Sequence, residues 1–252
     1  MFEFAALVVF LNLIMVCIGM PLPWTRVLDL EDPLMTGDDV LIAQNLLNRG
    51  ATKESLECDG IYGENMVQAV KQFQEVAFGT QEAETGVFDA NTAQVLLDTY
   101  SDDNVVDDGF SAGALGYKYK FSIPVSTNRS IETQGTLYDA NNGILHQFTV
   151  RAHGKRDDNG DYSWPDFGAE PGDDGLNQFT SSGNTPTGIV EVDLNSPEPN
   201  PQVYGPWPVN RIVKGVKGNA AFLLPSIRDG MLFHTGNWTT AEHGTFDPLT
   251  MT

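Results

Sequence analysis

The sequence predicts an α+β protein made of two units, a three-helix bundle followed by a mainly β domain. Apolar residues recur at helical spacing in three short segments between residues 36 and 100, whereas after residue 117 they alternate with polar residues as in strands. An acidic stretch that contains glycine, residues 101–116, separates the two patterns and favours an exposed linker. With 252 residues, the chain is long enough for one small and one medium domain.

Three amphipathic segments predict the helices of the first unit. The middle helix follows the tight turn Asp59-Gly60 and Gly63, and its apolar residues have the i, i+3, i+4, i+7 spacing of one buried face. The helix upstream follows Asp38-Asp39 and the helix downstream follows Asp89, residues that can cap helix N termini. The predicted core residues are Val40, Ala43, Leu46, Leu47, Met66, Ala69, Val70, Phe73, Ala93, Leu96, Leu97 and Tyr100.

Residues 36–100 resemble the peptidoglycan-binding domain family. That family joins a glycine and a glutamine of the first helix to an Asp-Gly-x-aromatic-Gly turn and a helix ending Ala-Val-x-x-Phe-Gln. The matching positions are Gly37, Val40, Gln44, Leu47, Asp59, Gly60, Tyr62, Gly63, Ala69, Val70, Phe73 and Gln74, with a weaker echo at Gly86, Phe88, Thr92 and Leu96. Met66 and Asp89 depart from the pattern, which usually has threonine and glycine there. The resemblance implies peptidoglycan as partner, with Gln44, Asp59 and Tyr62 as candidate substrate-binding residues.

The charge balance limits the other partners. The chain has 34 acidic against 14 basic residues, a formal net charge of -20. Such a surface repels phosphate backbones and anionic lipid. We therefore expect no nucleic-acid partner and no binding to a membrane surface.

The amino terminus predicts secretion. Residues 4–20 are almost continuously apolar and are followed by Pro21 and Pro23, which favours a signal peptide over residues 1–20 despite Glu3 in place of a basic start. A membrane anchor is the alternative, although the run is shorter than the roughly 20 residues that a spanning helix needs. Signal removal leaves Cys58 alone, either as a small buried side chain or paired with a cysteine of another chain.

The second unit, residues 117–252, has the alternation of β-strands. Residues 117–123 alternate, and residues 136–138 and 144–150 flank a turn that predicts a hairpin with Gly143 at the positive-φ position. Further strands are predicted over 188–194, 211–216 and 220–224. The polar insertion 155–183 lacks the glycine and glutamate of a calcium loop, and no His-Glu-x-x-His zinc motif occurs. We expect no metal and no cofactor.

Two stretches of this unit resemble the L,D-transpeptidase catalytic domain. They are the turn Thr185-Pro186-Thr187-Gly188 before a strand, and an apolar strand ending at His234 with Gly236 close behind. The resemblance implies that His234 is the general base with Gly236 beside it, and that Thr185 and Thr187 contact the stem peptide. His243 is a second histidine next to glycine, in a polar turn where we expect it to be exposed to solvent.

The family's nucleophile segment, Ser-x-Gly-Cys, has no counterpart in this sequence, because no cysteine follows Cys58. We expect a chain truncated before the catalytic cysteine, and the alternative is a relative without enzymatic activity. The expected function is that of a secreted peptidoglycan-binding protein with a truncated L,D-transpeptidase-like cysteine acyltransferase domain acting on cell-wall peptide stems. A non-catalytic cell-wall recognition or defence protein remains the alternative.

Overall fold

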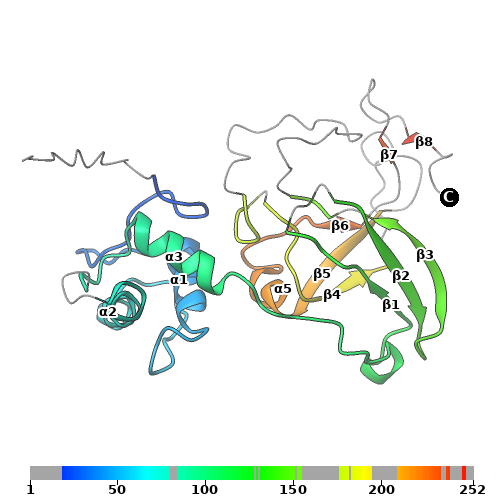
Figure 1. Ribbon diagram of the computed structural model, residues 1–252, viewed down its shortest axis with the longest axis horizontal. Helices are drawn as coiled ribbons and strands as arrows, with labels where there is room; N and C mark the ends of the chain where they lie inside the picture. The colour runs from blue at the N-terminus through cyan, green and yellow to red at the C-terminus, as the bar shows by residue number, and fades with distance from the viewer. Residues whose placement is uncertain are drawn as a thin grey trace, which may run out of the picture.

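The computed structural model describes residues 19–79, 84–127, 129, 131–150, 152–154, 176–181, 183–194, 209–233, 237–238 and 246–247. Three long helices gather at one end of the molecule and antiparallel sheets at the other (Figure 1). The predicted α+β class is confirmed. No helix in the described ranges is long and apolar enough to cross a membrane.

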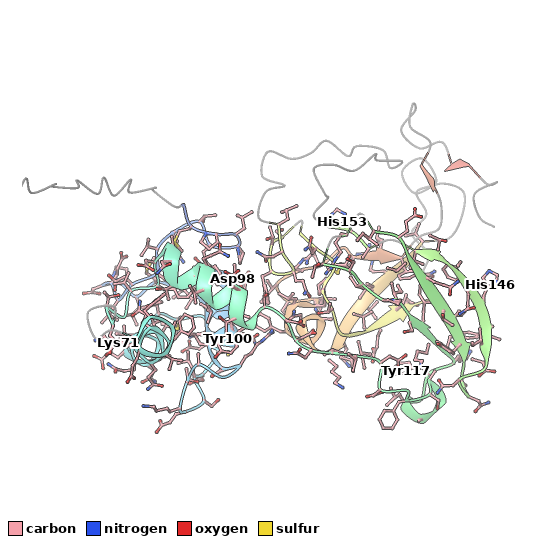
Figure 2. The ribbon with its side chains drawn as sticks, viewed as in Figure 1. Lys71, Asp98, Tyr100, Tyr117, His146 and His153 are labelled. Atoms are coloured by element: carbon pink, nitrogen blue, oxygen red, sulfur yellow. The ribbon has the colours of Figure 1, made fainter. Side chains whose placement is uncertain are left out.

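The helical module consists of α1 (Asp38–Leu47), α2 (Glu64–Phe78) and α3 (Ala90–Tyr100). All of the predicted core residues are buried except Tyr100, the last residue of α3, which is half-buried against the core (Figure 2). Asp89 caps α3, because its carboxylate accepts a hydrogen bond from the Thr92 N–H at 2.8 Å. The prediction of a similar cap for α1 was wrong: Gly37 occupies the N-cap without a side-chain bond, and Asp38 and Asp39 lie inside the first turn.

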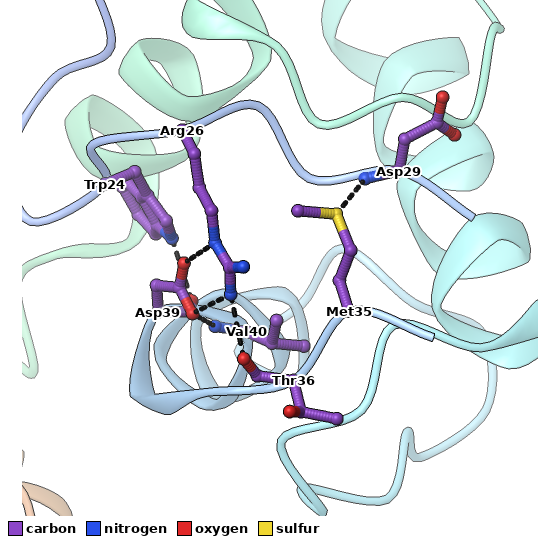
Figure 3. Close-up of polar contacts among 7 residues, drawn as sticks. All are labelled: Trp24, Arg26, Asp29, Met35, Thr36, Asp39 and Val40. Carbon is purple, nitrogen blue, oxygen red and sulfur yellow. Dashed lines mark hydrogen bonds and ion pairs between the residues drawn. The ribbon is translucent and has the colours of Figure 1, made fainter. Parts of the chain in front are cut away.

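A segment that the sequence patterns did not assign, residues 20–36, completes the module; we call it the N-terminal strap. Trp24 and Leu28 are fully buried, and Leu28 exchanges two backbone hydrogen bonds with Phe88. The Trp24 indole donates to the Asp39 carbonyl at 2.8 Å, and the Arg26 guanidinium pairs with the Asp39 carboxylate at 2.7 Å (Figure 3). Asp39, the second residue of α1, therefore holds the strap on this helix and also accepts from the Val40 N–H at 3.0 Å.

The first sheet has the order β1 (Tyr119–Ser122), β2 (Thr133–Asp139) and β3 (Ile144–Val150), all antiparallel. The predicted hairpin is present, but its positive-φ residue is Asn142 at φ 65°, not Gly143. Asparagine tolerates this conformation better than most residues do. Gly143 is needed for space instead, since a Cβ there would lie 2.6 Å from a carboxylate oxygen of Asp139.

The second sheet has the order β4 (Ile189–Asp193), β5 (Asn210–Lys217) and β6 (Leu232–Phe233), and β7 (Asn237–Trp238) pairs with β8 (Phe246–Asp247). The predicted strand over 220–224 is wrong, because this run forms the short helix α5 (Asn219–Leu223). Short apolar runs suit a buried helix as well as a strand. Here α5 is closely packed on β5, where a Cβ on Gly215 would lie 1.8 Å from the Ala220 carbonyl oxygen.

Aromatic side chains join the two larger sheets. The Phe121 ring stacks on Phe148 and meets the edge of Phe233, with both pairs of centroids 5.0 Å apart. Gly135 allows this packing, since a Cβ there would lie 2.7 Å from the Phe121 ring. The end of β6 is thereby placed beside the first sheet.

Candidate functional site

The Asp59 turn of the module is held by one buried side chain of α1, Gln44. The Gln44 amide donates to Asp59 Oδ1 at 2.8 Å and to the Ile61 carbonyl at 3.1 Å, and its oxygen accepts from the Gly60 N–H at 2.8 Å. Gly60 has φ +71°, which favours glycine, and a Cβ there would make a tight contact of 3.3 Å with the Gly37 carbonyl oxygen. The glutamine and the turn, 16 positions apart in the sequence, therefore form one rigid clamp.

A groove of about 300 Å³ lies beside this clamp, between the turn and the first turn of α2. Its lining comprises Gln44, Leu56, Glu57, Asp59, Ile61, Gly63, Glu64, Asn65 and Met66. These nine described residues include three carboxylates and no basic side chain. Hydrogen bonds from Gln44 and the Ile61 N–H lower the pKa of Asp59, so its carboxylate stays charged into mild acid. Both bonds end on Oδ1, which leaves Oδ2 with the capacity to accept from a ligand.

The three predicted binding residues of the module have different positions. Gln44 and Asp59 line the groove, whereas Tyr62 is fully buried and does not. The Tyr62 hydroxyl donates to the Gly86 carbonyl at 2.7 Å, and burial raises its pKa. Tyr62 thus supports the turn from the core.

The weaker echo in the sequence corresponds to a second clamp of the same design. Gln74 of α2 accepts from the Gly86 N–H at 3.0 Å and donates to the Val87 carbonyl at 2.9 Å, as Gln44 does with Gly60 and Ile61. It also donates to the Thr92 hydroxyl at 3.0 Å. Each clamp precedes a helix, but the groove described above lies beside the first clamp only.

In the β unit, the two predicted threonines make intramolecular hydrogen bonds. The Thr185 hydroxyl accepts from the His153 N–H at 3.0 Å, and the Thr187 hydroxyl lies 2.8 Å from Asp103 Oδ2. Two buried arginines fix the same turn: Arg129 donates to the Thr185 carbonyl, and Arg228 to the carbonyls of Gly183 and Asn184. Burial lowers the pKa of both guanidinium groups. The turn is thus rigid, and contact of Thr185 and Thr187 with a ligand stays a prediction.

The predicted histidine site lies outside the described residues. His234, Gly236 and His243 all do, as does most of the 155–183 insertion. What the structure describes is the strand before it: β6 ends at Phe233, which pairs with Asn210 of β5. The role of His234 as general base therefore stays a prediction.

The sequence Gly109-Phe110-Ser111-Ala112-Gly113 fits the Gly-x-Ser-x-Gly pattern of serine hydrolases. The catalytic version places the serine between a strand and a helix. Here no strand precedes Ser111 in the described stretch 101–118, and a single 3-10 turn (Gly113–Leu115) follows it. The Ser111 hydroxyl instead accepts from the Ala114 N–H at 3.2 Å, which makes the motif a local turn.

Two further chemical features limit what the module can do. Cys58 is an exposed free thiol, so of its two predicted alternatives the buried side chain is wrong. Partial burial of the thiol raises its pKa. No group of histidine, cysteine, aspartate or glutamate among the described residues has the arrangement of a metal site. The described lining of the groove consists mainly of carboxylates, amides and apolar side chains.

The first unit is thus a small helical module with a groove beside its Asp59 turn. Residues 36–96 match the family model described as "Putative peptidoglycan binding domain". No match to the chain was found among curated proteins or solved structures. The resemblance of the helical unit to a peptidoglycan-binding domain is confirmed over residues 36–96, and this match suggests peptidoglycan as a partner.

Proposed function

We propose that this protein binds cell-wall peptidoglycan through the groove beside Asp59. The observation that carries the proposal is the coincidence of the groove with the family's Gln44–Asp59 clamp, inside the matched residues 36–96. Carboxylates accept hydrogen bonds from sugar hydroxyls and peptide N–H groups, and side-chain amides can both accept and donate. Leu56, Ile61 and Met66 provide apolar surface beside them, as is common in ligand sites.

Filling the groove is expected to abolish wall binding. Asn65 is exposed at the second position of α2 and lines the groove, so Asn65→Trp adds bulk there without disturbing the core. Asn91 is exposed at the corresponding position of α3, away from the groove, and Asn91→Trp is the matched control. In a pelleting assay with purified peptidoglycan we expect a loss of affinity of about tenfold or more for Asn65→Trp, equivalent to about 1.4 kcal/mol. Equal pelleting of the two variants would contradict the groove assignment.

We propose further that the β unit is L,D-transpeptidase-like and recognises the peptide stems of the wall. The Thr185–Gly188 turn leads into β4, and β6 ends at Phe233, the residue before His234 in the sequence; this is the order that the sequence resemblance requires. A soluble stem tetrapeptide is then expected to bind the full chain and to lose about tenfold in affinity in His234→Ala. His146, exposed on β3, provides the control His146→Ala. Titration calorimetry measures both, and equal affinities would contradict this proposal alone.

The alternative is a cell-wall recognition or defence protein that binds without turnover. Binding of this kind needs only surfaces that contact the wall, and no nucleophile to attack a carbonyl. The two proposals differ in what happens to bound stems. Mass spectrometry of peptidoglycan fragments after incubation separates them, since acyl transfer changes the stem mass and binding does not.

We also propose secretion, because a wall-binding module requires contact with the wall and residues 4–20 are apolar. Sequencing the amino terminus of the mature protein tests this. Cleavage near residue 20 is expected, and an intact residue 1 would favour the membrane-anchor alternative.

A further inference from the structure

The helical module and the β unit meet at a set of polar side chains that we call the junction network: Arg49, Asp103, Gln178, Thr187 and Asn219. Arg49 follows the C-cap of α1. Its guanidinium donates to the Tyr100 carbonyl at 2.9 Å within the module and to the Asn219 side-chain oxygen of the β unit at 2.5 Å. It also lies over the Phe179 ring, 5.8 Å from the centroid. One side chain thus touches both units.

Asn219 is the partner on the other side, and it is fully buried. Its amide donates to the Ser101 carbonyl at 2.9 Å and to the Gln178 oxygen at 3.0 Å, and its N–H donates to Asp103 Oδ2 at 2.7 Å. Every polar atom of the Asn219 side chain therefore has a hydrogen-bond partner. Two partners of Asn219, Ser101 and Asp103, lie directly after α3. Separating the units would leave those groups unpaired or require water to replace each bond.

The junction also binds the segment predicted to be a free linker. Asp103 accepts from the Asn219 N–H at 2.7 Å and from the Thr187 hydroxyl at 2.8 Å. The strap is fastened too, because the Asn177 side-chain amide donates to the Leu22 carbonyl at 2.6 Å. The strap, the end of α1 and the end of α3 thus each have a direct bond to the β unit.

Apolar packing continues across the same boundary. Phe179, Ala220, Leu223 and Leu224 belong to one buried cluster with the core of the helices. A cavity of about 330 Å³ lies there as well, lined by strap residues 20–22, by Leu97 and other residues of α3, and by Asn177. In Figure 1, α5 is the element of the β unit that lies nearest the helices.

Units joined only by a flexible linker normally move relative to each other. Here a shared core and a satisfied polar network oppose that motion.

We propose that the junction network locks the wall-binding module and the β unit into one rigid body, with Arg49 as the coupling residue. The rigid coupling of the two units follows from the contacts above and does not depend on what the groove binds. Its functional consequence rests on the proposed function: a wall strand held in the groove has one fixed position relative to the Thr185–Gly188 turn. The protein then presents both surfaces to the wall in a single geometry.

The experiment measures the distance distribution between the units by pulsed electron paramagnetic resonance. One spin label is attached to Cys58, an exposed thiol of the module, and the other to Ile144→Cys, at a residue of β3 that is 61% exposed. Cys17 is replaced by serine so that only these two sites react. A single narrow distribution is expected for the otherwise unaltered full chain, and a broad one overturns the proposal.

Two arginine variants then test the coupling residue. Arg49→Met is expected to broaden the distribution and to split thermal unfolding into two transitions. Arg26→Met is the control, because Arg26 bonds Asp39 and Thr36 within the module. Equal behaviour of the two variants overturns the role of Arg49. If circular dichroism shows that Arg49→Met does not fold, Asp103→Asn is measured in its place, with the same broadening expected and an unchanged distribution counting against the network.

Discussion

Replacing Trp24 with alanine is expected to destabilise the helical module by about 3–5 kcal/mol, the usual cost of truncating a buried aromatic side chain to alanine. Trp24 is fully buried, meets the Phe88 ring edge to face at 4.9 Å and donates its indole N–H to the Asp39 carbonyl. The substitution therefore removes core volume and leaves a carbonyl without its partner. Urea unfolding, followed by far-ultraviolet circular dichroism, measures the change.

A second substitution separates the two contributions. Trp24→Phe keeps most of the ring and removes only the N–H, so we expect a smaller loss, about 1–3 kcal/mol for the unpaired carbonyl. A loss below about 1 kcal/mol for Trp24→Ala would mean that the strap is not part of the folded unit.

The same reasoning predicts that residues 36–96 alone fold poorly, since that fragment lacks both Trp24 and Leu28.

The helical module could be predicted well from the sequence because its core follows one helical period. Met66, Val70 and Phe73 are buried, as their spacing indicates. The sequence resemblance indicated Gln44 as a binding residue. The structure shows that Gln44 makes three hydrogen bonds to the turn, which accounts for a glutamine at this position. Spacing alone does not distinguish a residue that lines a groove from one that shapes it. Tyr62 illustrates this, because its ring completes the core and only its neighbours face solvent.

The strap and the junction could not be predicted from periodicity. Residues 20–36 contain three prolines and no regular apolar repeat, so nothing in the pattern indicates that Trp24 and Leu28 enter the core. The acidic stretch after Ser101 suggested a free linker, since isolated carboxylates usually face water. Asp103 departs from that expectation because its partners, Thr187 and Asn219, come from more than 80 residues away. Contacts at such separation follow from the fold rather than from local sequence.

The two glutamine clamps allow a prediction in which each variant is the control for the other. Gln44→Leu and Gln74→Leu both remove a buried amide and leave a turn N–H and a carbonyl unpaired: Gly60 and Ile61 in one case, Gly86 and Val87 in the other. A buried group left unpaired costs about 1–3 kcal/mol, and the two carbonyls are only partly buried, so both variants are expected to lose about 2–5 kcal/mol of stability. Chemical denaturation measures this for the pair.

Peptidoglycan binding is expected to separate them. Gln44 also holds Asp59, and both residues line the groove, whereas Gln74 does not line it. At a temperature where circular dichroism shows both variants folded, Gln44→Leu is expected to pellet with the wall at least about tenfold more weakly than Gln74→Leu, a difference of about 1.4 kcal/mol. Because the two substitutions are chemically identical and occupy equivalent positions in the two clamps, a general loss of stability would weaken both alike. Equal weakening would therefore show that the Asp59 clamp supports the fold without forming the ligand site.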